Sequence, residues 1–155
     1  MHLFALRQTP FFPSFSVFDS LEQLPQWMAL YLYRNGMSND IYIYKCLLLE
    51  RLDWHSASVE LSIKSHQPQV HIFHAFMANS ESGTLIFDYD FQSQLDKVED
   101  GARTVIILNK HQLMERMEFV LMQIDALNKN QPKRKFYVID PAELPFGAHF
   151  CLYKG

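Results

Sequence analysis

The stretch NKHQLMERMEFVLMQIDALN, residues Asn109–Asn128, decides how the rest of the chain is interpreted. Its apolar residues recur with the spacing of a single helical face, at Leu113, Met117, Val120, Leu121, Ile124 and Leu127. Asn109 is suited to cap the first turn, and Pro132 prevents the helix from continuing. A helix with so wide an apolar stripe needs a flat apolar partner. We therefore expect it to pack on a β-sheet, mainly through Met117, Val120, Leu121 and Ile124.

Four segments before this helix carry strand-like patterns of β-branched, aromatic and alternating residues. They are Ile41–Arg51, Ser58–Lys64, Gln69–Met77 and Thr84–Phe91, although the end of the first, LLLERL, is also compatible with a helix. The linkers between them are short and resemble turns, which favours an antiparallel meander.

The remaining segments complete the prediction. Arg103–Leu108 is apolar on both faces, which indicates a central strand, and Lys135–Asp140 and Ala148–Tyr153 are closing strands. A second helix is expected from Asp19 or Ser20 to Asn35, with its regular part starting at Pro25.

The whole chain, residues 1–155, is therefore predicted to be a single α+β domain. Its sheet would have about six to seven strands, largely antiparallel, packed by two main helices. The order of elements is loosely similar to that of GNAT-type N-acetyltransferases. However, FQSQLDKVEDGAR (residues 91–103) lacks their Gln/Arg-x-x-Gly-x-Gly/Ala pattern, so we do not place the chain in that family.

Composition excludes several classes of function. A net charge of −3 provides no basic surface for nucleic acid, and two cysteines are too few for a disulfide scaffold. No apolar run is long enough to span a membrane, and the N-terminus is a poor signal peptide, so we expect a cytoplasmic protein without a membrane partner.

An aromatic arm, Thr9–Phe18 (TPFFPSFSVF), interrupts these regular patterns. Its two prolines argue against a helix or a central strand, yet its phenylalanines need burial. The arm can lie on the core of its own domain or pack on another subunit. The second alternative predicts a homodimer, with an interface made by Phe11, Phe12, Phe15, Phe18 and Trp27.

Three residues are the main candidates for chemistry. Asp88 and Asp90 share one face of a predicted strand, where two carboxylates can act as an acid/base pair or bind a cation. His71 is the histidine that we add to them. His71 and His74 should point to opposite faces of their strand, one toward solvent and one into the core, so we expect no shared metal site.

The sequence contains no catalytic motif of high specificity, and we expect no cofactor, metal or disulfide. Cys46 and Cys151 fall in strand patterns, where buried thiols are poor nucleophiles. The leading hypothesis is a small cytosolic protein-binding module, of the inhibitor or immunity type, that acts through a surface. The alternative is a small transferase or hydrolase that uses Asp88, Asp90 and a histidine.

Overall fold

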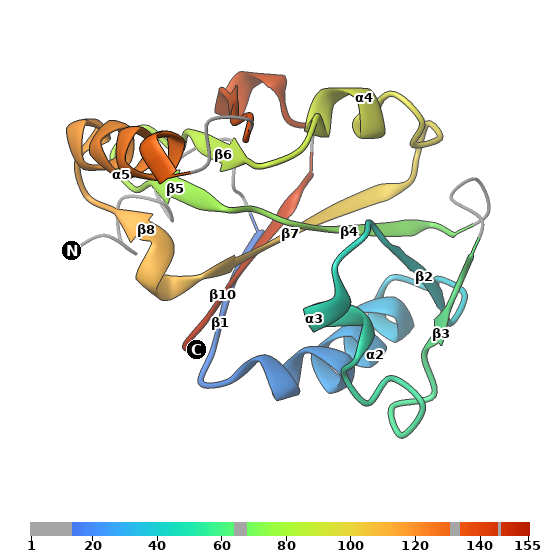
Figure 1. Ribbon diagram of the computed structural model, residues 1–155. Coiled ribbons are helices and arrows are strands. Elements are labelled where there is room, and N and C mark those ends of the chain that lie inside the picture. Colours follow the sequence, from blue (N-terminus) through green and yellow to red (C-terminus); the bar gives the residue numbers. More distant parts are fainter. Residues whose placement is uncertain (1–13, 64–67, 131–133, 146) are drawn as a thin grey trace.

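The main sheet of the protein has six strands, and all of them are parallel. The computed structural model describes residues 14–63, 68–130, 134–145 and 147–155 (Figure 1). In spatial order the strands are β1 (Ser14–Phe18), β10 (His149–Tyr153), β7 (Arg103–Asn109), β4 (Val70–His74), β2 (Asp40–Ile43) and β3 (Glu60–Leu61). Every neighbouring pair is parallel.

The predicted antiparallel α+β sheet is therefore wrong, and the fold is α/β. The error lies in the connections, because segments interpreted as strands are in fact crossovers. The predicted strand Ile41–Arg51 ends at Ile43 and is followed by helix α3 (Leu47–Glu50). Thr84–Phe91 contains only a short strand, β6 (Leu85–Phe87), which is not in the main sheet. The four segments thus form no meander.

A second, four-stranded mixed sheet lies against one face of the main sheet (Figure 1). Its order is β8 (Leu113–Met114), β5 (Met77–Asn79), β6 and β9 (Tyr137–Ile139). The β5–β6 and β6–β9 pairs are antiparallel, while β5 and β8 are parallel. The predicted strand Gln69–Met77 is divided between the two sheets, since β4 ends at His74 and β5 begins at Met77.

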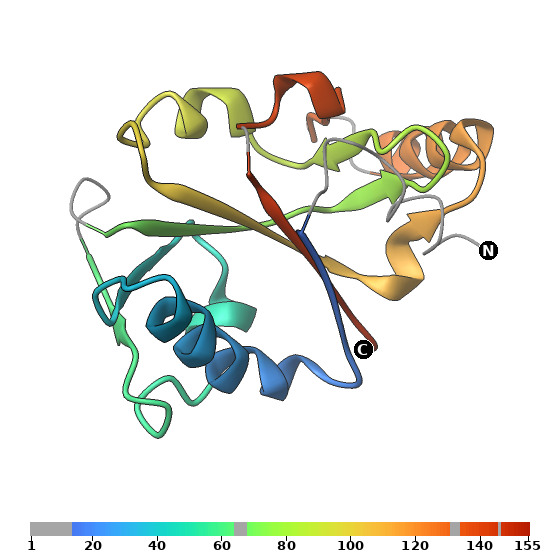
Figure 2. The same cartoon turned by 180° about the vertical axis from the view of Figure 1, so that it is seen from behind.

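Elements cover both faces of the main sheet, which explains why its central strands β4, β7 and β10 are buried along most of their length. The face that carries Ile72 and Val105 packs against helix α2 (Leu24–Arg34) and against α3. The opposite face carries Phe73 and Ile106, and it packs against α4 (Phe91–Leu95) and the small sheet. The two views show these layers on either side of the strands (Figures 1 and 2).

The long helix predicted over Asn109–Asn128 begins eight residues later, as α5 (Met117–Asn130). Asn109 ends β7 and caps the short 3-10 helix η2 (Lys110–Gln112), and Leu113 belongs to β8. Helix α5 packs on the small sheet, where Val120 is fully buried with Met77 and Ile86. Leu121 is 52% exposed, so its predicted place in the helix–sheet contact is wrong.

Other predictions are confirmed. Arg103–Leu108 lies in β7, whose residues from Thr104 to Leu108 are all buried in the middle of the sheet. The second helix divides as expected, with the 3-10 helix η1 (Leu21–Gln23) before α2 and Pro25 in the first turn of α2. Its end at Asn35 is followed by Gly36 with a φ of 62°, a conformation that suits glycine. A last 3-10 helix, η3 (Pro141–Glu143), precedes β10.

Candidate functional site

A cavity of about 340 Å3 lies at the carboxyl ends of the main-sheet strands. The chain leaves β2 toward the face covered by α2 and α3, and it leaves β4 toward the face covered by the small sheet (Figure 1). Adjacent strands whose connections diverge in this way open a crevice, which is where α/β proteins bind ligands. The residues that matter below are Lys45, His74, Asp88, Tyr89, Asn109 and Tyr153.

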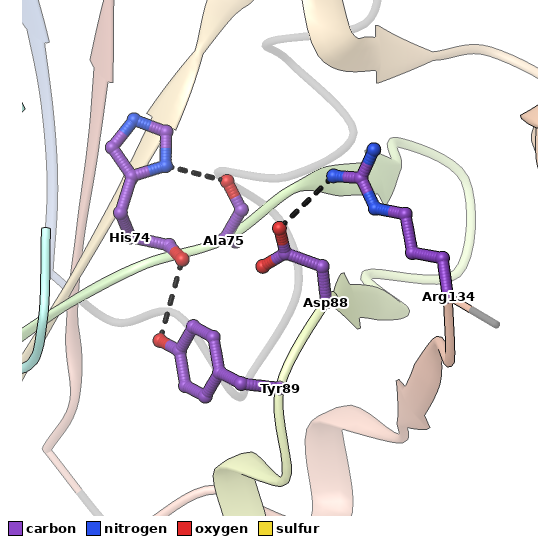
Figure 3. Close-up of polar contacts among 5 residues, drawn as sticks. All are labelled: His74, Ala75, Asp88, Tyr89 and Arg134. Atoms are coloured by element: carbon purple, nitrogen blue, oxygen red, sulfur yellow. Dashed lines mark hydrogen bonds and ion pairs between the residues drawn. The ribbon is translucent and has the colours of Figure 1, made fainter. Parts of the chain in front are cut away.

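His74 ends β4 and is half-buried in this cavity. Its Nδ1 lies 2.7 Å from the carbonyl oxygen of Ala75 (Figure 3). A carbonyl only accepts hydrogen bonds, so Nδ1 carries the ring proton and Nε2 is the acceptor of the neutral imidazole. Burial lowers the pKa of His74, and the Ala75 carbonyl and the Asp88 charge offset only part of this effect. The imidazole is therefore neutral at pH 7.

Tyr153, at the end of β10, supplies the proton that His74 Nε2 accepts, across 2.8 Å. The neighbouring strand brings Asn109 into register with Tyr153. The Asn109 amide oxygen accepts from the His111 backbone N–H, which leaves its NH2 group to donate to the Tyr153 hydroxyl. Burial raises the pKa of Tyr153, and the hydrogen bond from Asn109 lowers it in part. A continuous hydrogen-bonded chain thus runs from Asn109 through Tyr153 and His74 to Ala75.

Asp88 and Tyr89 follow β6 and form another wall of the cavity. Arg134 donates to the Asp88 carboxylate across 3.0 Å (Figure 3). The Arg134 guanidinium also lies over the rings of Phe76 and Phe136, at 4.7 and 5.2 Å from their centroids. The Tyr89 hydroxyl donates to the His74 carbonyl across 3.3 Å. Burial, together with the nearby Asp88 charge, raises the pKa of Tyr89. Tyr89 is thus a hydroxyl donor that stays protonated.

The third wall is the turn between β2 and α3. Lys45 has a φ of 25°, an uncommon backbone conformation for a residue with a side chain, and its ammonium lies 5.8 Å from the Tyr44 ring centroid. Cys46 occupies the N-cap position of α3. Burial raises the pKa of the Cys46 thiol by more than the backbone N–H groups of α3 lower it. The turn therefore contributes a cation and a protonated thiol to the cavity.

The sequence-based candidates are only partly brought together. Asp88 lines the cavity, but Asp90 does not, because its carboxylate accepts from the Ser93 N–H and caps α4. The two do not share a strand face, since β6 ends at Phe87. His71 is buried on the opposite side of β4 from His74, and its Nε2 has no hydrogen-bond partner. The expectation that one of these histidines faces solvent is wrong, because His71 is buried and His74 is half-buried. His74, rather than His71, lines the cavity together with Asp88.

The aromatic arm is described from Ser14 onward, where it forms the edge strand β1. Phe15 stacks on Phe150 with a centroid distance of 5.8 Å, and Phe18 is buried at 5.7 Å from Trp27. Phe11 and Phe12 lie outside the described residues. The described part of the arm therefore packs on its own domain.

Sequence reasoning missed Lys45, His74, Asn109, Arg134 and Tyr153 as site residues. For His74, Asn109 and Tyr153 a usable signal existed, because each is the last residue of a predominantly apolar strand. In a parallel sheet such residues gather at one edge. Lys45 and Arg134 lie in connections and carried no comparable signal.

Comparison with known proteins shows similarity in fold. The structure resembles that of a DUF162 family protein from Deinococcus radiodurans. The match has a TM-score of 0.59 and 13% sequence identity, and it covers 92% of this chain and 88% of that one. No protein-family model matches this chain, and no curated protein sequence matches it. At this identity the likeness supports the α/β fold alone.

Two further observations concern the part of the chain that the structure describes. No helix in it is long and apolar enough to cross a membrane. Within the same residues, no group of three or more His, Cys, Asp or Glu side chains is arranged to hold a metal ion.

Proposed function

We propose that this protein binds a small polar molecule at the carboxyl edge of its parallel sheet and promotes a proton transfer there. The observation that carries the proposal is the His74–Tyr153 hydrogen bond of 2.8 Å in the cavity that Asp88 also lines. This is a revised form of the transferase or hydrolase hypothesis. Asp88 is retained, His74 takes the place of His71, and Asp90 has no role.

The proton would move in two linked steps. A substrate group that donates to the Tyr153 oxygen gives its proton to that oxygen, while the Tyr153 proton passes to His74 Nε2. The substrate loses one proton and His74 gains one. The resulting imidazolium keeps its Nδ1–H bond to Ala75 and is stabilised by the nearby Asp88 carboxylate. Lys45, on the rim of the cavity, is suited to attract negative charge on the ligand.

A screen of small polar metabolites by ligand-observed NMR tests binding. Wild type is compared with Tyr153→Phe and Asp88→Asn. The matched controls are Tyr33→Phe on α2 and Asp125→Asn on α5, because both residues are exposed and neither lines the cavity. We expect ligands whose saturation signal is lost in both cavity variants and kept in both controls. The proposal would be overturned if every ligand found bound all five proteins equally, or if no compound in the screen bound the wild type.

The protein-binding hypothesis remains a second proposal, because one surface favours it. Helix α5 turns Phe119, Leu121 and Met122 outward, with exposures of 46%, 52% and 65%. Exposed apolar groups of this kind are common at contacts between proteins. If a second copy of the chain covers this surface, Leu121→Arg should abolish a dimer seen by sedimentation. A wild-type protein that sediments as a monomer at all concentrations would exclude that contact.

A further inference from the structure

The lining of the carboxyl-edge cavity is polar at one end and has exposed apolar surface at the other. In the main sheet, β10 and β7 lie on one side of β4, and β2 lies on the other. The ends of β10 and β7 and the turn after β7 bring the polar side chains of Tyr153, Asn109 and Gln112. The segment after β2 brings the apolar surface of Tyr44 and Leu48. His74, at the end of β4, lies between the two ends.

The apolar end continues outside the cavity, on helix α3. Leu48 lines the cavity and is nevertheless 54% exposed, and Leu47, beside it in the sequence, is 64% exposed. The contact of α3 with the core is made by Leu49, which is fully buried, so Leu47 and Leu48 are not what holds the helix in place. Two exposed leucines that continue a ligand cavity provide a surface on which an apolar part of the ligand can lie.

The polar end suits a hydrogen-bond donor better than an anion. The Tyr153 hydroxyl gives its proton to His74 and accepts one hydrogen bond from Asn109, which leaves its oxygen one further acceptor position. A negatively charged head group would meet an acceptor there, and the Asp88 carboxylate lies in the same cavity. An uncharged O–H group fits, and Lys45 on the rim stabilises the negative charge that remains once the proton has left. The bound group is therefore a weak acid that arrives protonated.

The size and the aromatic rings of the cavity limit the body of this acid. A volume of about 340 Å3 is near the lower end of the range, roughly 300–1,000 Å3, in which small-molecule pockets fall. It suits one ring and a short chain. The rings of Tyr44, Phe76 and Tyr89 line the cavity, and all three side chains are partly exposed. Aromatic side chains favour stacked or edge-to-face contacts with another planar ring, so a ring in the ligand complements this lining.

We infer that the substrate of this site is an amphipathic weak acid, a phenol-like hydroxyl compound that carries a short alkyl chain. Its hydroxyl donates to Tyr153, its ring contacts Tyr44 and Tyr89, and its chain lies on Leu48. The inference rests on the proposed proton transfer and names the class of molecule that gives up the proton. The phenolic O–H bond breaks, and Tyr153 receives that proton and passes its own to His74. The products are a bound phenolate and an imidazolium.

Isothermal titration of the full chain with phenol and with 4-butylphenol tests the inference. We expect one molecule of either compound per chain, with 4-butylphenol bound at least about tenfold more tightly. Each methylene group contributes roughly fourfold when it is fully buried, and a chain on α3 is covered on one side only. Leu48→Ser should reduce the difference between the two compounds to less than about threefold. The control Leu30→Ser, at a leucine of α2 that is also 54% exposed and does not line the cavity, should leave the difference unchanged.

Tyr153→Phe separates this inference from the proton transfer on which it rests. Because it removes one hydrogen bond at the polar end, both compounds should bind roughly three- to tenfold more weakly, while the difference between them is kept. If Tyr153→Phe changed neither affinity and Leu48→Ser still removed the difference, the proton transfer would be overturned and the amphipathic class supported.

Three results would overturn the inference itself. They are equal affinity of the wild type for the two compounds, equal effects of Leu48→Ser and Leu30→Ser, and binding of neither compound to the wild type. In each case the screen of polar metabolites still decides the proposed function. Thermal melting of every variant shows that each is folded.

Discussion

The stability of this protein should depend on pH through His149, the first residue of β10. The ring is buried, 4.7 Å from the Trp27 ring and 5.8 Å from the Tyr31 ring, and its Nε2 lies 2.8 Å from the Ser16 hydroxyl. Burial is the cause that lowers the pKa of His149 from 6.5 to about 4, and no nearby charge opposes it. The folded state therefore holds this imidazole neutral well below the pH at which the unfolded chain protonates it.

The sign and size of the effect follow from the linkage between protonation and folding. Well above pH 6.5 the ring is neutral in both states and contributes no pH dependence. As the pH falls from 6.5 toward 4, His149 takes up a proton in the unfolded state but not in the folded state, so the free energy of unfolding declines. At pH 5 the loss from this one group is about 2 kcal/mol. Burial also lowers the pKa of His71 and His74, which adds to the loss in the same direction.

Urea titrations at pH 7.5 and pH 5.0 measure this effect. The wild type should lose more stability between these two values than either His149→Gln or His149→Phe, by about 2 kcal/mol, because neither replacement can take up a proton. A difference in stability between the two variants at pH 7.5 does not affect the comparison, which uses only each protein's change between the two pH values. If both variants kept the full pH dependence of the wild type, burial of His149 would not be its source.

Three further predictions concern the packing of α5, the oligomeric state, and the absence of a structural metal, a disulfide and a reactive thiol. Val120→Ala should cost about 1.5–3 kcal/mol and Leu121→Ala less than about 1 kcal/mol in urea titrations, because only Val120 is buried; a larger loss for Leu121 would contradict the orientation of α5. The homodimer predicted from the aromatic arm is checked by sedimentation, where a lone species of 18.3 kDa at micromolar concentration would exclude it in that range. Chelator and reductant should each leave the melting temperature unchanged. Burial raises the pKa of the Cys46 and Cys151 thiols, so we expect both to be unreactive, and rapid labelling of either in the native protein by a thiol reagent would contradict this.

Local patterns predicted local structure well, but they could not fix strand direction. The run VIIL in β7 identified a central strand because both faces are apolar. The same property holds for β4 and β10, whose residues are nearly all buried, and it favours a parallel sheet covered on both sides. The prediction of a meander relied on short linkers instead, and part of what looked like strand before Arg51 is the helix α3 that connects parallel strands.

Helix α5 shows a second limit of periodicity. Its apolar residues extend so far around the helix that the pattern does not single out one buried side. The choice is made by the partner: the small sheet presents Met77 and Ile86 to Val120, while Leu121 is left toward solvent. The start of the helix moves for a similar reason, since Leu113 pairs with Ala78 in β5 rather than opening the helix.

The missed site and the wrong topology are consequences of one error. His74 and Tyr153 are 79 residues apart in the chain, yet the parallel register of β4, β7 and β10 aligns His74 with Ile107 and Asn109 with Tyr153. In an antiparallel sheet neighbouring strands end at opposite edges, so the last residue of β7 would be separated from the last residues of β4 and β10. In a parallel sheet the ends coincide, so a polar residue that ends an apolar strand is placed beside the others. Strand direction, which the sequence pattern leaves open, therefore decides whether His74, Asn109 and Tyr153 line one cavity.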